Sequence, residues 1–151
     1  MGKLLKKVGS CKYLEILFDS ELKWTLHIES IYKKKIIKCC SIFYKLRDKL
    51  PIRMPKDIYY AFVHPHILYG IEIYVNTKIS YLDKLIKLNN KLLRILQHKP
   101  ITTPVLELYK SYDILPIPLL HKQQLLLFAY KFIHHPKLLP EVFINNICFY
   151  I

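Results

Sequence analysis

The chain has 151 residues, which suits one domain or a piece of a larger one. Hydrophobic residues make up 52% of it, so the composition supports a packed core and excludes a disordered chain. Twenty-four Lys and Arg against eleven Asp and Glu give a formal net charge of +13. This excess favours a polyanionic partner, either nucleic acid or an acidic membrane surface; the alternative is a compositional bias toward lysine.

The cysteines and the N-terminus indicate the compartment. Two of the four cysteines, Cys39 and Cys40, are adjacent, so no disulfide framework is predicted and a reducing compartment is favoured. The opening Met-Gly-Lys-Leu-Leu-Lys lacks the apolar core of a signal peptide, and the longest uncharged run, 58–71, is too short to span a bilayer. We therefore expect an intracellular protein, nuclear or cytoplasmic, without a transmembrane segment.

The first patterned stretch covers residues 12–28. A β-rich apolar run from Tyr13 to Phe18 predicts a strand, and Asp19-Ser20-Glu21 predicts a turn. A long helix is predicted from about Leu26 to Lys49, with Thr25 as its N-cap.

The long helix is expected to bury one face and to expose a basic one. Apolar residues recur at spacings of three and four, which predicts a buried face made of Ile28, Tyr32, Ile36, Cys39, Phe43, Leu46 and Leu50. At about 100° of rotation per residue, four lysines fall in a narrow stripe elsewhere. They are Lys34, Lys38, Lys45 and Lys49.

Proline, glycine and capping residues predict four further helices. The first begins near Pro55, is interrupted at Pro65 and ends near Gly70; the others run from the cap Ser80 to Gln97, from Thr103-Pro104 through Tyr109, and from Pro118 to His134. The predicted fold class is mainly α, an array of about five helices that follows one short N-terminal β-strand or hairpin.

Two blocks of sequence carry a resemblance to a known family. The first comprises Lys12, Tyr13, Leu14, Asp19, Leu22, Trp24, His27 and Ile28, and the second is Tyr-Tyr-Ala-Phe-Val-His-Pro-His-Ile-Leu-Tyr-Gly at 59–70. This order resembles the C-terminal, primer-grip and thumb region of non-LTR retrotransposon (jockey/LINE-like) reverse transcriptases, with weaker similarity to about Phe143. The resemblance implies a remnant palm edge over 1–24 and a helical thumb-like region over 25–151, together a single incomplete domain.

The resemblance also implies a parent activity, RNA-directed DNA polymerisation. Its two-metal chemistry needs paired carboxylates, which the family carries in a Tyr-x-Asp-Asp segment upstream of this region. The aspartates Asp19, Asp48, Asp57, Asp83 and Asp113 are scattered over separate predicted elements. We therefore predict no catalytic residues, no enzymatic activity and no cofactor, and we expect the missing palm domain of a parent polymerase as a partner.

Four residues, Lys12, Tyr13, Leu14 and Glu15, are implied by the same resemblance to be primer-grip-like. The family carries a glycine where Glu15 stands, and a glycine would let a primer phosphate approach the backbone closely. Glu15 either faces that path, which would compromise polymerase function, or points to solvent.

Histidine pairs raise the question of a metal site. His64 and His66 are one residue apart and His134 and His135 are adjacent, whereas zinc ligands on a helix usually lie three to five apart. We predict no metal site.

The predicted function is sequence-independent binding of an RNA or RNA–DNA duplex through phosphate contacts. We assign it to basic residues of the long helix, namely Lys33, Lys34, Lys35, Lys38, Lys45, Arg47 and Lys49. Two alternatives stay open: a decayed transposon relic with no selected function, and a basic helical protein that binds a membrane surface peripherally.

Overall fold

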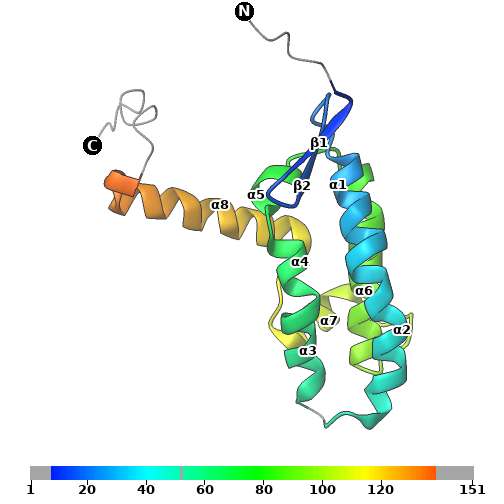
Figure 1. The fold of residues 1–151 in the computed structure, drawn as a ribbon. Coiled ribbons are helices and arrows are strands. Elements are labelled where there is room, and N and C mark those ends of the chain that lie inside the picture. Colours follow the sequence, from blue (N-terminus) through cyan, green and yellow to red (C-terminus); the bar gives the residue numbers. More distant parts are fainter. Residues whose placement is uncertain (1–7, 52, 139–151) are drawn as a thin grey trace, which may run out of the picture.

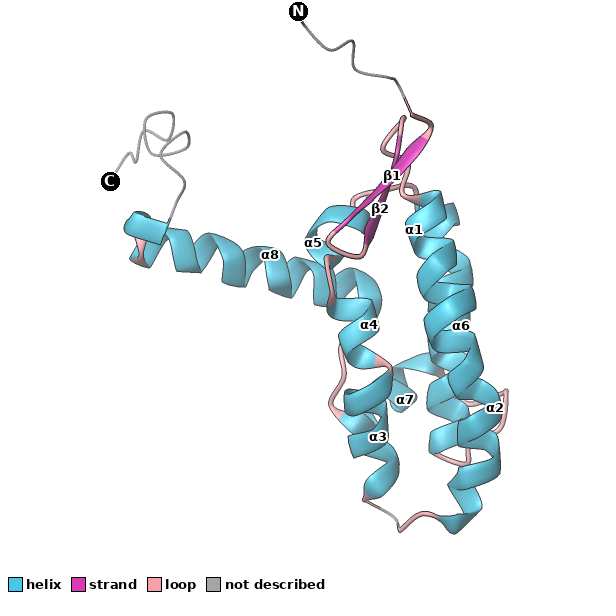
Figure 2. Cartoon of the chain, viewed as in Figure 1, coloured by secondary structure: helices cyan, strands magenta, loops and turns pink. Residues whose placement is uncertain are grey.

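The computed structural model describes residues 8–51 and 53–138, and it shows a short β-hairpin followed by helices (Figures 1 and 2). The elements in chain order are β1 (Ser10–Tyr13), β2 (Ile16–Asp19), α1 (Thr25–Ser30), η1 (Ile31–Ile36), α2 (Ile37–Leu46), η2 (Arg47–Lys49), α3 (Met54–Phe62), α4 (His64–Leu68), α5 (Ile71–Tyr74), α6 (Ile79–Leu96), α7 (Val105–Tyr112), α8 (Ile117–His134) and η3 (Pro136–Leu138). The predicted fold class, mainly α behind an N-terminal hairpin, is confirmed. The predicted segments 1–24 and 25–151 extend beyond the described residues at the two ends of the chain. Phe143, where the weaker resemblance was expected to end, also lies outside them.

The N-terminal element is a hairpin, one of the two forms that the sequence left open, and its turn falls inside the apolar run 13–18. β1 and β2 pair antiparallel from Ser10↔Asp19 to Tyr13↔Ile16, with Leu14 and Glu15 between them. Both turn residues have positive φ, 45° and 64°. A two-residue turn with positive φ at both positions matches the right-handed twist of the paired strands. The prediction of a single strand over 13–18 is therefore wrong.

The hairpin is joined to the first helix by a loop organised around Asp19. Its carboxylate accepts hydrogen bonds from the backbone N–H groups of Glu21 (3.2 Å), Lys23 (2.9 Å) and Trp24 (2.8 Å). These bonds, led by the one from Lys23, lower the pKa of Asp19. The turn predicted at Asp19-Ser20-Glu21 is confirmed.

The predicted N-caps are wrong at three helices. The position before α1 is occupied by Trp24 in the left-handed region, that before α6 by Lys78, and that before α7 by Pro104. None of these makes a side-chain cap. The predicted caps were Thr25, Ser80 and Thr103, and each differs from the observed cap position by one or two residues, which is the usual uncertainty of a helix end.

The long helix runs without a break in direction from α1 to η2, close to its predicted bounds (Figure 2). Its second segment, η1, is a π-helix, which holds more residues per turn than an α-helix. The uniform 100° rotation behind the predicted lysine stripe therefore fails between Lys34 and Lys38. The buried face is confirmed at Ile28, Ile36 and Phe43, whereas Leu46 is exposed.

The core forms around α6, which packs against α2, η1 and α7. The buried side of α6 consists of Leu82, Leu85, Leu88, Asn89, Leu92, Leu93 and Leu96. Complete burial of one leucine side chain is worth about 1.5–3 kcal/mol, so this face is the main apolar contribution to the fold. Figure 1 shows α6 alongside the α1–α2 helix, with α3 and α4 on the other side of the molecule.

The break predicted at Pro65 and the helix end predicted at Gly70 are confirmed. α3 ends at Phe62, α4 begins at His64, and Gly70 adopts φ 72° between α4 and α5. A Cβ atom on Gly70 would lie 2.9 Å from Cδ1 of Ile16 in the hairpin. Glycine is therefore suited to this position for two reasons: it adopts the left-handed conformation without strain, and it leaves room for Ile16 of β2.

Candidate nucleic-acid interface

The two blocks that carry the family resemblance pack against each other. The hydroxyl of Tyr69, at the end of α4, donates a 2.6 Å hydrogen bond to the carbonyl of Leu14 in the hairpin turn. Next to it, Gly70 lies against Ile16 of β2. Segments separated by more than fifty residues therefore form one surface, and the hairpin tip is fixed to α4.

A basic hollow lies where the hairpin, η1 and α4 meet. Its volume is about 460 Å³, and its polar lining consists of Lys12, Glu15, Ser30, Lys34, Lys35, His66 and Tyr69. Among these, Glu15 is the one carboxylate, and it pairs with Lys12 at 2.5 Å. Lys34 and Lys35 have no acidic partner within the described part of the chain, so the hollow carries a net positive charge. We call it the hairpin hollow.

Histidine 66 adds a neutral group to the hairpin hollow. Burial lowers the pKa of His66, and the nearby charge of Lys35 lowers it further. A neutral imidazole offers one donor and one acceptor and brings no extra charge to the site. His66 and Tyr69 are not among the predicted site residues, although the His-Pro-His segment is part of the second family-like block.

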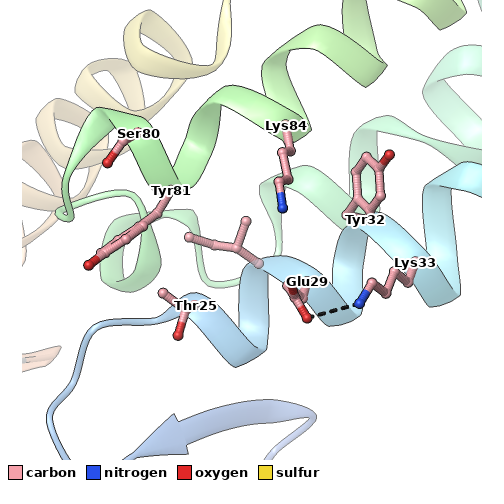
Figure 3. A pocket seen from close by; sticks show the side chains of 8 residues that line it. Thr25, Glu29, Tyr32, Lys33, Ser80, Tyr81 and Lys84 are labelled. Atoms are coloured by element: carbon pink, nitrogen blue, oxygen red, sulfur yellow. Dashed lines mark hydrogen bonds and ion pairs between the residues drawn. The ribbon is translucent and has the colours of Figure 1, made fainter.

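Three consecutive lysines in the π-helical turn line two different hollows. Lys34 and Lys35 line the hairpin hollow. Lys33 instead pairs with Glu29 at 3.1 Å, beside a smaller hollow of about 180 Å³ that also includes Lys84 and Tyr81 of α6 (Figure 3). The predicted group Lys33–Lys35 is thus divided between two surfaces.

The remaining predicted residues lie farther along the helix. Lys38, Lys45 and Lys49 are exposed, and they have no carboxylate partner among residues 8–51 and 53–138. Arg47 shares a hollow with residues of α6, and its guanidinium carbon lies 4.3 Å from the centre of the Tyr44 ring on α2. The structure therefore places the seven predicted residues in more than one location.

The primer-grip-like residues Lys12, Tyr13, Leu14 and Glu15 are all exposed at the hairpin tip. A hydrogen bond from Lys12 lowers the pKa of Glu15, so its carboxylate is charged. Of the two alternatives for Glu15, the structure shows an exposed side chain, and this side chain also borders the hairpin hollow. Its φ of 64° explains in physical terms why glycine suits this position.

The part of the chain that the structure describes shows neither a metal-binding cluster nor a membrane-spanning helix. Within the described residues, no three His, Cys, Asp or Glu side chains are grouped so that they could hold a metal ion. None of the helices in that part of the chain combines the length and apolar character needed to cross a bilayer.

The hairpin, the long basic helix and the His-Pro-His helix packed on the hairpin contain the two blocks that carry the resemblance, and the comparisons support it: the chain is similar to a region of non-LTR retrotransposon reverse transcriptases. Two curated relatives are the RNA-directed DNA polymerases from mobile element jockey of Drosophila melanogaster and of Drosophila funebris, each 29% identical, over 101 and 102 residues. These matches cover 66% of this chain, and the chain spans about 11% of the length of each relative. No family model matches the chain. No solved structure matches it either.

Proposed function

We propose that this chain is a non-catalytic, thumb-like part of a non-LTR retrotransposon reverse transcriptase and that it binds the backbone of an RNA or RNA–DNA duplex without reading sequence. The observation that carries the proposal is the hairpin hollow. It brings Lys12, Lys34 and Lys35 together at the contact between the two family-like blocks. The polymerase activity in the relatives' names belongs to those proteins as a whole, and this chain spans about 11% of their length.

Electrostatics supports phosphate binding without base readout. Lysine ammonium groups act as point charges toward phosphate and carry no base specificity. Beyond the hollow, Lys38, Lys45 and Lys49 extend the positive surface along the same helix. With a formal charge of +13, the chain would also attract a polyanion over a distance of about 8 Å at physiological salt.

The aspartates support the non-catalytic part of the proposal. The carboxylate of Asp19 is occupied by backbone N–H groups, Asp83 pairs with Lys87 at 2.6 Å, and Asp48 lies 3.7 Å from Arg47. Asp113 sits in the left-handed region at the end of α7. Each of these four aspartates thus has a local structural setting, and no two of the four share a site; Asp57 lies in the first turn of α3.

Exposed apolar side chains near the N-terminal hairpin fit a palm domain as partner. Tyr13, Leu14 and Leu22 are all exposed, and they lie on or next to the hairpin. In a parent polymerase the palm would cover such a surface. A protein that handles retrotransposon RNA in this way would work in the nucleus or the cytoplasm.

Charge-matched variants test which lysines bind the duplex. The first variant replaces Lys12, Lys34 and Lys35 with Gln; the second replaces Lys38, Lys45 and Lys49; the control replaces Lys110, Lys122 and Lys131 of α7 and α8. Each variant removes three charges, and at the helical positions Gln has nearly the same helix propensity as Lys. We expect an affinity in the range of about 10⁻⁴ to 10⁻⁶ M, with a salt dependence that becomes shallower by about 0.9 for each phosphate contact removed.

The measurement is fluorescence anisotropy of a labelled RNA–DNA duplex over a series of salt concentrations. The first variant should lose the most affinity, the second less, and the control least. Equal losses in all three would show that binding follows net charge alone and would refute the interface. Template-dependent nucleotide incorporation by the purified wild-type chain would refute the non-catalytic assignment.

A further inference from the structure

A second basic hollow lies at the opposite end of the long helix, between Arg47 and the C-terminal turns of α6. It has a volume of about 510 Å³ and is lined by Arg47, Lys87, Asn90, Lys91, Arg94 and Lys99, together with two isoleucines. Lys87, Lys91 and Arg94 follow the helical spacing of four and three, so α6 directs all three toward the same side. Of these lining residues, Arg47 alone belongs to the predicted binding set. We call this site the distal hollow.

The cations of the distal hollow are only partly neutralised. Lys87 pairs with Asp83 at 2.6 Å, Lys99 pairs with Glu107 at 2.9 Å, and Arg47 lies 3.7 Å from Asp48. Lys91 and Arg94 have no carboxylate partner among the described residues, and none of the residues that line the hollow is acidic. Two uncompensated positive charges therefore face one concave space.

Both guanidinium groups are fixed in place, and both retain free donor capacity. A terminal nitrogen of Arg94, Nη2, donates a 3.1 Å hydrogen bond to the carbonyl of Thr103, which orients the group without neutralising it. The ring of Tyr44 holds the Arg47 guanidinium at 4.3 Å. In each arginine the Nε is buried and makes no hydrogen bond within the described part of the chain, and that of Arg47 lies 3.7 Å from Oδ2 of Asp48, so the donors left for a ligand are terminal guanidinium nitrogens. Oriented guanidinium groups are the donors that suit phosphate oxygens best.

A chain of hydrogen bonds from the core determines what Asn90 offers to the distal hollow. The Tyr59 hydroxyl donates to Oδ1 of Asn89 (3.0 Å), and Nδ2 of Asn89 donates to the Tyr109 hydroxyl (3.0 Å). The Tyr109 hydroxyl then donates to Oδ1 of Asn90 (2.8 Å). Because its oxygen is already engaged, Asn90 has its Nδ2 donor left for a ligand. The hollow thus presents donors and cations, which is the chemistry that an anion requires.

We propose that the distal hollow is a separate binding site for a phosphate group, contacted chiefly by Lys91 and Arg94 and aided by Arg47 and Asn90. The identification of the phosphate as one from a nucleic-acid backbone rests on the proposed function. At 1.5 Å per residue, Lys35 and Arg47 are separated by about 18 Å of helix, so one phosphate group cannot reach both hollows. The two hollows would bind different phosphates of one duplex.

The test begins with inorganic phosphate as the probe and thermal unfolding as the readout, with chloride at the same ionic strength as the reference. A ligand that binds only the folded chain raises the Tm. We expect phosphate to raise the Tm of the wild type. Lys91→Glu, which places a carboxylate beside Arg94, should weaken phosphate binding by about tenfold or more. The matched control is Lys122→Glu on α8, which should keep the full effect.

Circular dichroism checks that each variant is folded, and Lys91→Gln provides a milder change if Lys91→Glu loses helicity. Equal phosphate stabilisation of the wild type and both Lys91 variants, or none in the wild type, would overturn the site. The duplex assay separates the two proposals. If Lys91→Gln makes the salt dependence of duplex binding shallower by about 0.9, the distal hollow contacts backbone phosphate. If phosphate binds at the distal hollow but the duplex does not bind, the proposed function fails and the anion site stands.

Discussion

The backbone N–H of Leu17 donates a hydrogen bond to Nδ1 of His27 over 3.3 Å, and this bond ties β2 to the first turn of α1. It requires a neutral imidazole, because a protonated Nδ1 is a donor and cannot accept. The other nitrogen, Nε2, is buried and has no acceptor among the described residues, and the ring packs edge-on against Tyr74 at 5.2 Å. The hairpin is therefore held by a histidine in one protonation state.

The first prediction is that acid weakens the fold through His27. Burial lowers the pKa of His27 below its ordinary value of 6.5. The unfolded chain therefore binds more protons below about pH 6.5, and the free energy of unfolding falls as the pH drops through that value toward the lowered pKa. The urea midpoint should be constant from pH 8 to 7 and then decline. Burial lowers the pKa of His64 and His66 as well, so their contribution has the same sign.

A variant isolates the His27 contribution. His27→Asn retains an acceptor near the position of Nδ1 but does not titrate. Between pH 7 and 5.5, the urea midpoint of this variant should decline less steeply than that of the wild type. Identical slopes would assign the acid sensitivity to the other histidines.

The second prediction concerns the hairpin turn. Glu15→Gly should raise the Tm by about 2–4 °C, because glycine adopts the positive φ at this position without steric cost. Glu15→Ala loses the same ion pair with Lys12 but keeps a Cβ, so it should show no gain. Thermal melts monitored by circular dichroism would compare the three chains. A gain in the alanine variant equal to that in the glycine variant would mean that charge, and not backbone conformation, is responsible.

A third prediction follows from the contact between Gly70 and Ile16. Gly70→Ala should cost about 1–2 kcal/mol, since it places a side chain at φ 72°. Its Cβ would also press on Cδ1 of Ile16. Ile16→Val removes that atom, so chemical denaturation of the single and double variants forms a cycle that separates the two causes. If Ile16→Val restores none of the stability lost in Gly70→Ala, the whole loss is due to the backbone conformation at residue 70.

The buried hydrogen-bond chain yields a fourth prediction. Tyr59→Phe should lower the free energy of unfolding by about 1–3 kcal/mol, because it leaves Oδ1 of the buried Asn89 without a donor. The neighbouring Tyr60→Phe is the control: its hydroxyl donates to the carbonyl of Asp113 at an exposed site. Urea unfolding should show a change within about 0.5 kcal/mol for that variant. Equal losses in the two variants would contradict a specific role for the buried chain.

A fifth prediction concerns α8, which extends away from the other helices in Figure 1. Leu126 and Phe128 are 71% and 56% exposed, so the chain should bind an apolar dye and associate as its concentration rises. Replacing both residues with Gln should reduce dye fluorescence and shift gel filtration toward the monomer without loss of stability. Leu120→Gln, at a site only 5% exposed, should instead destabilise the fold. A dye-negative, monomeric wild type would refute the prediction.

Helix positions could be predicted from the sequence where strong local signals mark them. Pro65 and Gly70 predicted real breaks, and the apolar spacing along the first long helix predicted the burial of Ile28, Ile36 and Phe43. A hairpin was one of the two predicted forms, but the position of its turn could not be predicted in the same way, because neither Leu14 nor Glu15 is a typical residue for positive φ. Tertiary contacts with Tyr69 and the pairing of Tyr13 with Ile16 accompany that conformation.

The candidate site was less predictable than the fold. A stripe of lysines can be drawn on a helical wheel only if the rotation per residue is constant, and η1 breaks that condition. The grouping of Lys12 with Lys34 and His66 depends on contacts between segments far apart in the chain. For the distal hollow, by contrast, the spacing of Lys87, Lys91 and Arg94 was a visible signal, and what the sequence did not show was the approach of Arg47.

The π-helical turn η1 changes the number of residues per turn within the long helix. Without a change of direction, η1 takes up one residue more per turn than the α-helical segments on either side of it. The upper end is oriented for the hairpin and α4, and the lower end for α6. Removing one residue from 31–36 would let the segment rewind as α-helix with both ends close to their present orientation. The extra residue therefore changes how Lys33, Lys34 and Lys35 are distributed around the helix, and the hairpin and the α6 interface could both be kept without it.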